Sequence, residues 1–281
     1  MNRRRLLLGL LALVLVMFLV ACQSRAIPQP ILTAHFIDVG QGDSILLQAG
    51  KMNVLIDAGE REMGERVVAY LRAEGVKSID LLIATHPHAD HIGGLAAVMA
   101  SFPVRRIIDS GQVHTSQTFL NYLRLVDDKK IPFETPNAQV VELAAGVTLR
   151  VIGPRQAYDG LNDGSVVALV TAEQVSLLLT GDMEERAERD LVAAGGIAAQ
   201  ILKVGHHGSS TSSTRGFLQM VRPQVAIISV GQGNPYGHPA EPVLARLRES
   251  GADIYRTDVH GTVVLRTDGA KFSIKTQRRT R

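Results

Sequence analysis

The segment at residues 85–94 (THPHADHIGG) constrains this chain more than any other. It follows an apolar run at 80–84 (DLLIA) that is typical of a strand buried on both faces of a sheet. Within six positions it places three imidazoles and one carboxylate: His86, His88, Asp90 and His91. These side chains bind transition metals when deprotonated, and their mixture of nitrogen and oxygen donors suits a zinc-type site. The alternative is a polar loop with chance histidines, but the crowding of four ligands between a buried strand and a Gly-Gly helix start favours the metal site.

The composition is that of a globular protein, with 46% hydrophobic and 20% charged residues in 281 positions. The formal net charge is +3, and the three arginines Arg3, Arg4 and Arg5 account for all of it. Beyond residue 21 the basic and acidic side chains are therefore equal in number. This balance argues against strong binding of duplex DNA, which needs several cationic contacts to phosphates.

The first residues have the pattern of a secretory signal. After the three arginines, residues 6–20 form an apolar stretch that is shorter than the about 20 residues of a spanning helix and typical of a signal peptide. Residues 19–22 (LVAC) resemble the bacterial lipobox, which implies cleavage after residue 21 and lipid attachment to Cys22, the only cysteine. An uncleaved N-terminal anchor is the alternative. Either interpretation predicts a membrane-anchored, extracytoplasmic protein.

The predicted domain organisation follows from this leader. Residues 1–21 are the lipoprotein signal peptide, residues 22–32 are a proline-containing linker, and residues 33–281 are the functional domain. Strands are predicted at 34–39, 44–48, 54–56, 80–84, 107–108, 166–171, 175–179, 201–204, 225–230, 254–255 and 262–265. Helices are predicted at 66–74, 95–100, 118–129, 183–194, 217–221 and 242–250. The mixture, with a hairpin at the start of each half, predicts an α+β fold of two sheets inside two helical layers.

Three further polar clusters follow predicted strands, at 180–182 (TGD), 205–210 (GHHGSS) and 231–239 (GQGNPYGHP). Alone, Asp182 is equally well explained as a helix N-cap that stabilises by about 1 kcal/mol. Beside the histidine cluster, we expect it to bind metal, and one carboxylate can bridge two ions. At least one of His206 and His207 is expected to be a ligand. Adjacent residues on an extended chain point to opposite sides, so both need not bind.

These motifs together resemble the metallo-β-lactamase-fold hydrolases, and in particular the hydrolase domain of the ComEC competence (DNA-uptake) proteins. The resemblance covers nearly the whole mature chain and rests on HxHxDH at 86–91, HFIDVGQGDS at 35–44, LIDAG at 55–59, NDGSVVALV at 162–170, LLTGDMEERAERDL at 178–191, LKVGHHGSSTSS at 202–213, NPYGHP at 234–239 and TDVHGTVVL at 257–265. It implies an αββα four-layer sandwich with metals at one sheet edge, here as a stand-alone lipoprotein.

The resemblance also implies a division of the ligands between two ions. One ion is expected on His86 and His88, the other on Asp90, His91 and a histidine of the 206–207 pair, with His207 preferred. The bridging ligand is expected to be Asp182. The cofactor is then one or two Zn²⁺ ions, with Mn²⁺ as the alternative.

One departure from the family pattern affects the first ion. Many members supply another histidine between the HxHxDH cluster and the bridging aspartate. Here only His114 lies in that interval, in a poorly matching context, and Asn162 and Asp163 stand where the ComEC-like branch carries polar residues. The sequence therefore leaves open whether the site holds two ions or one.

The expected chemistry is hydrolysis by a metal-activated hydroxide, because zinc-class ions lower the pKa of bound water toward about 7. Asp90 is expected to orient the nucleophile or accept its proton. His238 is a candidate ligand for a substrate oxyanion or a proton donor, with a packed loop histidine as the alternative. Asp57 is expected to orient a metal-binding histidine.

The resulting prediction is an extracytoplasmic metal-dependent hydrolase that acts on a phosphodiester, as a phosphodiesterase or nuclease with DNA as one substrate. A cell-wall phosphodiester (choline-type) esterase is an alternative. A second alternative, from another class, is a lipid-anchored protein that binds nucleic acid or envelope polymer without cutting it; the missing histidine is its best support. No protein partner is deducible.

Overall fold

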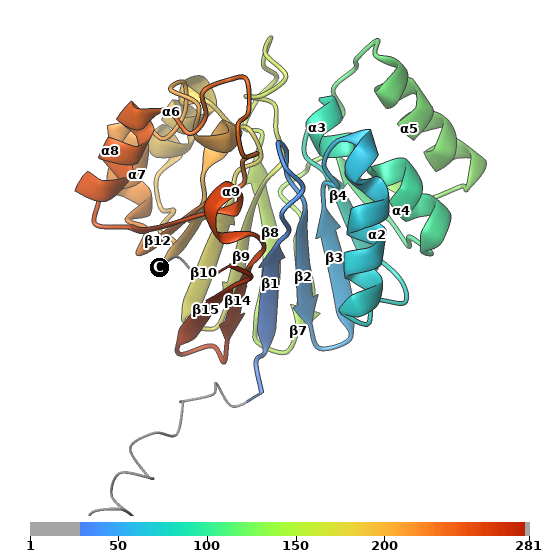
Figure 1. Cartoon of the computed structure of the whole chain (residues 1–281), viewed down its shortest axis with the longest axis horizontal. Helices are drawn as coiled ribbons and strands as arrows, with labels where there is room; N and C mark the ends of the chain where they lie inside the picture. The colour runs from blue at the N-terminus through green and yellow to red at the C-terminus, as the bar shows by residue number, and fades with distance from the viewer. Residues whose placement is uncertain (1–28, 279–281) are drawn as a thin grey trace, which may run out of the picture.

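The computed structural model describes residues 29–278, and the predicted signal peptide and Cys22 lie outside them. Two sheets lie face to face between two helical layers, as Figure 1 shows, which confirms the predicted αββα sandwich. In spatial order, the first sheet contains β15 (Phe272–Thr276), β14 (Val263–Thr267), β1 (Leu32–Phe36), β2 (Ile45–Ala49), β3 (Met52–Ile56), β4 (Leu81–Ala84), β5 (Ile107–Asp109) and β6 (Phe133–Glu134). The second contains β13 (Asp253–Arg256), β12 (Val225–Ile228), β11 (Ile201–Lys203), β10 (Val175–Leu179), β9 (Val167–Ala172), β8 (Val147–Gly153) and β7 (Val140–Ala144).

The helices cover the outer faces of the two sheets (Figure 1). The layer over the first sheet contains α2 (Gly64–Ala73), α3 (Ala89–Ile92), α4 (Leu95–Ser101) and α5 (Gln117–Asp128). The layer over the second contains α6 (Glu185–Ala194), α7 (Arg215–Val221) and α8 (Glu241–Glu249). Shorter turns are the 3₁₀ segments η1 (Arg61–Met63) and η2 (Gly205–Gly208), and α9 (Thr257–His260).

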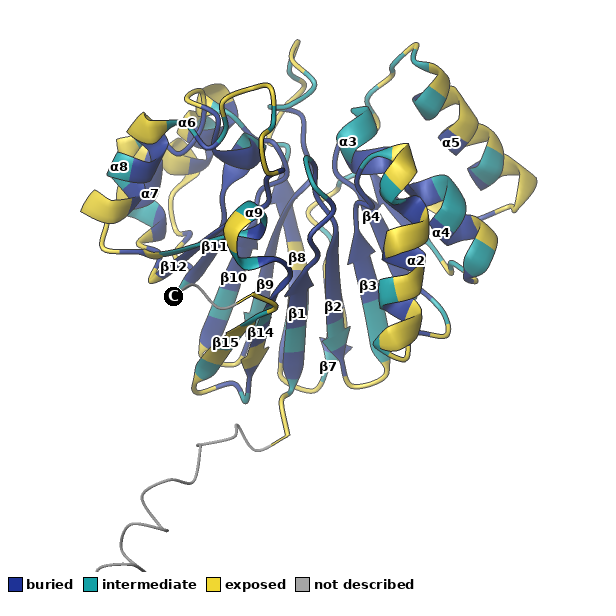
Figure 2. Ribbon diagram, viewed as in Figure 1, coloured by how far each residue is buried: buried dark blue, intermediate teal, exposed yellow. Residues whose placement is uncertain are grey.

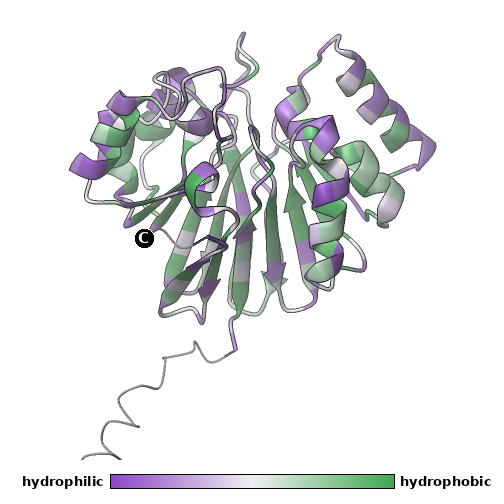
Figure 3. Cartoon of the chain, viewed as in Figure 1, coloured by the Kyte–Doolittle hydropathy of each residue, from purple (hydrophilic) through white to green (hydrophobic). Residues whose placement is uncertain are grey.

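Strand periodicity divides the apolar residues between an inner and an outer core. In β10, Leu177 and Leu179 point into the core between the sheets, while Leu178 points into the core beneath α6, α7 and α8. Successive side chains of a strand alternate between faces, so a strand that is apolar on both faces needs both cores. Figures 2 and 3 show the result, since the strands are largely buried and hydrophobic while polar residues lie on the outer surfaces of the helices.

Some predicted elements differ from the observed ones. The first strand was expected at 34–39, but β1 ends at Phe36 and the next residues lead into a loop. Strands β7, β8 and β15 and the two-residue β6 were not expected. The predicted strands at 166–171 and 175–179 are confirmed as the antiparallel pair β9–β10, in which Leu177 pairs with Val170.

A buried carboxyl group fixes the loop that follows η2. Glu188 of α6 is 1% exposed, and its carboxylate accepts hydrogen bonds from the backbone N–H groups of Ser213 and Thr214. Burial raises the pKa of Glu188 to about 7, against the opposing effect of these hydrogen bonds. The loop is therefore tied to α6 by a group that titrates near neutral pH.

This raised pKa predicts a pH-dependent stability. A carboxyl group whose folded-state pKa lies above the ordinary 4.5 contributes stability that is present below about pH 4.5 and is lost as the pH rises through about 7. Glu188→Gln cannot titrate. We therefore expect the free energy of unfolding of the wild type to fall, relative to that of Glu188→Gln, between pH 4.5 and 7 in urea titrations. The exposed control Glu185→Gln keeps Glu188, so its free energy of unfolding should follow that of the wild type across this pH range. A difference between the wild type and Glu188→Gln that is constant with pH contradicts the assignment.

Candidate metal centre

The polar loops that the sequence singled out meet at one edge of the sandwich. Strands β10, β11 and β12 are parallel neighbours, so the loops after them emerge side by side. The loop after β4, in the other sheet, reaches the same edge. It is attached to the second sheet just before β9, where the Val166 N–H donates to the carbonyl oxygen of Thr85 over 2.8 Å. Residues about ninety positions apart are thereby brought to one place.

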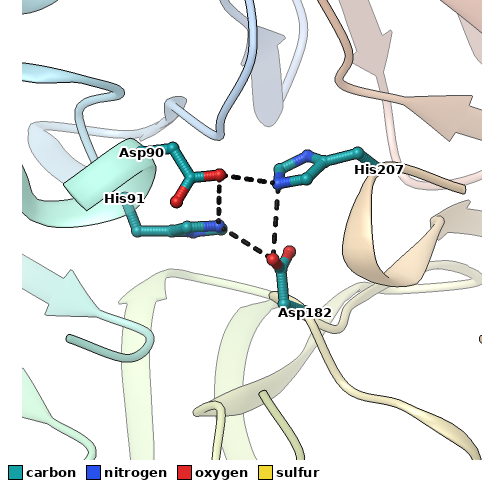
Figure 4. Close-up of side chains that lie close together, drawn as sticks. All are labelled: Asp90, His91, Asp182 and His207. Atoms are coloured by element: carbon teal, nitrogen blue, oxygen red, sulfur yellow. Dashed lines mark hydrogen bonds and ion pairs between the residues drawn. The ribbon is translucent and has the colours of Figure 1, made fainter. Parts of the chain in front are cut away.

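Four side chains form the centre of this site, as Figure 4 shows: Asp90, His91, Asp182 and His207. One ligand atom from each lies within 4.8 Å of the others. The Oδ2 atom of Asp182 is 3.2 Å from His91 Nε2 and 3.3 Å from His207 Nε2. His207 Nε2 is also 3.2 Å from Asp90 Oδ2. Two imidazole nitrogens and two carboxylates therefore face a common point, as for a metal with mixed N and O ligands.

The remaining predicted ligands lie around the same carboxylate. His86 Nε2 and His206 Nε2 are each 3.9 Å from Asp182 Oδ2. His88 is adjacent, with its Nδ1 2.9 Å from His86 Nε2. All of the sequence-predicted metal ligands are thus gathered, and four histidines face the same oxygen of Asp182.

Three of these histidines are held through the ring nitrogen that faces away from the centre. His91 Nδ1 is 2.7 Å from Asp57 Oδ2, His206 Nδ1 is 2.7 Å from Glu184 Oε1, and His207 Nδ1 is 2.9 Å from the carbonyl oxygen of Ser229. An acceptor at Nδ1 keeps the proton there and leaves the Nε2 lone pair for a metal, which is the usual arrangement of metal-binding histidines. Asp57 therefore lies where the sequence analysis expected it.

The backbone of the histidine pair is not extended, so the expectation that the two side chains point to opposite sides is wrong. His206 and His207 have φ values of 44° and 53°, both in the left-handed region. Each such residue costs about 1–3 kcal/mol and persists only where the surrounding structure holds it in place. The two rings consequently turn toward Asp182 together instead of to opposite sides. Strain of this kind at two adjacent residues is typical of functional sites.

The donor set fits a metal ion. His91 Nε2 and Asp182 Oδ1 are buried polar atoms that have no hydrogen-bond partner among the described residues. Buried groups of this kind are costly unless they are paired, and a cation at the centre would pair them. Both zinc and manganese bind imidazole and carboxylate ligands, so the donor atoms do not determine which of the two metals binds.

The electrostatics of the site are dominated by Asp182 and its histidines. Burial opposes the charged form of Asp182, but His207 and His91 outweigh it and hold the pKa of Asp182 well below its usual value. Burial likewise opposes a charged His207, yet Asp182 and Asp90 raise the pKa of His207 to about 9. Metal ligands must be deprotonated, so an ion that binds here displaces protons from the histidines.

The role of a buried lysine was not identified from the sequence. Lys203 is fully buried at the end of β11, and its Nζ lies 2.5 Å from Asp43 Oδ2 and 3.9 Å from Asp182 Oδ1. The same Nζ donates to the carbonyl oxygen of Gly181 over 3.0 Å, which fixes the turn that carries Asp182. The available signal was a lysine inside the apolar run at 201–204 (ILKV). Burial of an unpaired ammonium is prohibitive, so it required a carboxylate partner.

The residues near the missing histidine position have other roles. Asn162 Nδ2 donates to Glu184 Oε1 over 3.2 Å, and Asp163 Oδ1 accepts from the Glu184 N–H at the start of α6. They support Glu184 instead of facing Asp182. The ring of His114 lies 6.3 Å from that of His88, at the rim of the cluster. The ring of His238 lies 5.4 Å from that of His206.

The fold and this site define the class of the protein. Residues 37–232 match the family model described as the metallo-beta-lactamase superfamily, and the chain belongs to that superfamily of metal-dependent hydrolases. Among residues 29–278, no helix has the length and apolar character needed to cross a membrane.

Particular relatives are competence proteins. ComE operon protein 3 of Bacillus subtilis (strain 168) is 32% identical over 251 residues, which cover 82% of this chain and 32% of the relative. Competence protein ComA of Neisseria gonorrhoeae is 31% identical over 257 residues, which cover 90% of this chain and 35% of the relative. The chain thus spans about a third of the length of these relatives. The metallo-beta-lactamase fold protein YhfI of Bacillus subtilis has a similar structure, with a TM-score of 0.56, 12% identity and coverage of 83% of this chain and 98% of its own.

The anchoring of His206 gives a test of the site. Removal of the Glu184 carboxylate in Glu184→Ala frees the His206 ring, and loss of such a partner typically lowers metal affinity by about 10–100-fold. We expect that loss for one bound zinc or manganese ion in calorimetric titrations, with the affinity of the other unchanged. The neighbouring Glu185→Ala, which removes an exposed carboxylate paired with Arg189, is the control and should bind metal as the wild type does. Wild-type binding by Glu184→Ala contradicts the inference that Glu184 positions the His206 ring for a metal ion.

Proposed function

We propose that the chain is a metal-dependent phosphodiesterase with a two-ion centre. Membership of the superfamily gives the hydrolase class, and the two-ion centre is our inference from the geometry. The observation that carries it is the convergence of four histidine Nε2 atoms, at 3.2 to 3.9 Å, on a single buried oxygen of Asp182. A catalytic site with a single zinc ion uses about three protein ligands. Four imidazoles around one carboxylate exceed that number and are better explained by two ions.

The proposed ligands divide into two sets that share Asp182. The first set is His86, His88 and His206, and the second is Asp90, His91 and His207. In this division His206 takes the place of the histidine that the family pattern supplies elsewhere in the chain. The lack of that histidine was the best support for a non-catalytic binding protein. If His206, next to His207, supplies the missing ligand, that alternative is weakened.

When bound, two such ions lower the pKa of a coordinated water and neutralise negative charge that develops on a phosphoryl oxygen. Within the chain, Asp90 is the carboxylate positioned to act on the nucleophile, since its side chain is 23% exposed while that of Asp182 is buried. Burial works against ionisation, but His91 and His207 hold the pKa of Asp90 below its usual value. An ionised Asp90 accepts a hydrogen bond from the attacking water, so its proposed role is to orient the water.

His238 is proposed to contact the substrate. Burial, reinforced by His206 and His207, lowers the pKa of His238, so that its ring is neutral at pH 7. A neutral imidazole still carries one N–H group. We therefore assign it a hydrogen bond to a substrate oxygen in preference to the role of a charged acid.

A phosphodiester of DNA is the proposed substrate class. The relative named competence protein ComA supports it, and the chain spans about a third of that protein. The equal numbers of basic and acidic side chains beyond residue 21 favour single-stranded or short substrates over duplex DNA. A choline-type phosphodiester of the cell wall is the competing substrate, and a screen with manganese and zinc supplied separately distinguishes the two.

We further propose that the protein acts outside the cytoplasm, attached to a membrane through a lipid on Cys22. The support is the arginine-rich leader and the LVAC sequence at 19–22, which lie outside the described residues. Mass spectrometry of the membrane fraction tests this directly, because lipidation adds mass to Cys22.

The central role of Asp182 predicts the effect of its removal. Asp182→Ala should lower the rate of bis(p-nitrophenyl) phosphate cleavage by more than about 100-fold, since the bridging ligand supports several kcal/mol of transition-state stabilisation. Circular dichroism should remain that of the wild type, because Asp182 lies in a loop after β10. The control Asp159→Ala removes a fully exposed carboxylate and should retain wild-type turnover. Activity retained in Asp182→Ala refutes the bridging role, and a wild type that is inactive with both metals refutes the hydrolase.

A further inference from the structure

An exposed aromatic ring stands next to the metal centre. Tyr236 lies in the loop at 231–239 after β12 and is 68% exposed, the largest value for any Phe or Tyr among the described residues. Single exposed apolar side chains are common on protein surfaces, so the informative observation is the position of this ring beside the metal centre and not its exposure alone.

The loop that carries Tyr236 is closed around one side chain. Asn234 Oδ1 accepts hydrogen bonds from the N–H groups of Tyr236 (3.1 Å) and His238 (3.0 Å). Its Nδ2 donates to the carbonyl oxygens of Gly231 (3.0 Å) and His238 (2.6 Å). These four bonds fix the loop backbone on both sides of Tyr236. A ring presented by an ordered loop loses less conformational entropy when a ligand binds.

A continuous series of rings leads from Tyr236 to the centre. Tyr236 is stacked on His238, with ring centroids 5.8 Å apart and planes at 27°. His238 meets His206 edge-on at 5.4 Å, and His206 Nε2 is 3.9 Å from Asp182 Oδ2. A substrate whose phosphodiester lies at Asp182 therefore has its neighbouring group beside His238 and Tyr236.

We propose that Tyr236 is a stacking platform for an unpaired nucleobase next to the phosphodiester held at the metal centre. The inference rests on the proposed function and specifies its substrate as single-stranded nucleic acid. Aromatic side chains bind bases of any sequence in this way, because every base has a flat π-face. A base in a duplex is already stacked and paired, so the platform selects strands whose bases are free.

The shape of the aromatic group favours a base over a quaternary ammonium group. A choline-like cation is usually enclosed by several aromatic faces that form a cage. Here His238 is stacked against Tyr236 at an interplanar angle of 27°, so the pair offers a ligand the outer face of the Tyr236 ring and no enclosure. Choline phosphodiesters are therefore the contrasting ligand in the test.

The experiment measures binding of fluorescently labelled phosphorothioate oligothymidylate by anisotropy, with the full chain in detergent and manganese present. The comparison ligand is an abasic oligomer of equal length and charge. We expect the wild type to bind the thymidylate about tenfold more tightly than the abasic oligomer, since a tenfold preference corresponds to about 1.4 kcal/mol and stacking of one base on an aromatic side chain supplies energy of this order. Tyr236→Ala should bind the two oligomers equally, and Tyr236→Phe should keep the preference.

The control is Phe133→Ala, which removes an exposed aromatic side chain from β6 and should behave as the wild type does. The proposal is overturned if the wild type shows no preference for the oligomer with bases, or if Tyr236→Ala keeps it. It is also overturned if Tyr236→Ala loses binding of phosphorylcholine but not of thymidylate. One further outcome separates the two proposals. If the wild type binds bases through Tyr236 but does not cleave bis(p-nitrophenyl) phosphate, the stacking platform is supported and only the proposed hydrolase activity is refuted.

Discussion

The structure at the sheet edge depends on one electrostatic constraint, the burial of the Asp182 carboxylate. Removal of a charge from water is costly unless opposite charge and hydrogen bonds replace the water. Lys203 lies 3.9 Å from one oxygen of Asp182 but makes its closer ion pair with Asp43. The other oxygen faces four histidines, which bind a metal only in their neutral form. A cation bound at this point satisfies the carboxylate and the imidazoles together, and the neighbouring loops hold these groups in place.

The sandwich itself follows from the placement of apolar residues. Runs that are apolar on both faces, such as β4 and β10, can be stable only between two cores, and their parallel neighbours then deliver loops to one edge. These elements were predictable from sequence because burial on both faces leaves an uninterrupted apolar run. Strand β7 (VVELA) was not, since its alternate residues are exposed. Nothing local in such a short segment distinguishes an edge strand from a loop.

The candidate site was predictable in its residue types but not in its connections. Four candidate ligands within six positions indicate a metal site directly, and Asp182 likewise follows a predicted strand. The orientation of His206 was not predictable. Its left-handed backbone is imposed by packing, and the sequence at 206–207 contains no glycine that would have indicated such a conformation. The same holds for Glu184, whose role depends on a contact with His206 across the site. Tyr236 is a single aromatic residue in a polar loop, and only its place beside His238 gives it a functional meaning.

The central claim is that Asp182 is shared by two metal ions, one on each set of ligands. Anomalous X-ray diffraction from crystals soaked in manganese tests it most directly, since each bound ion gives a separate peak. The account predicts two peaks about 3.5–4 Å apart, as in other two-metal sites, with Asp182 between them and His206 and His207 on different ions. A single peak among Asp90, His91, Asp182 and His207, with His206 bound to no ion at saturating manganese, would contradict it.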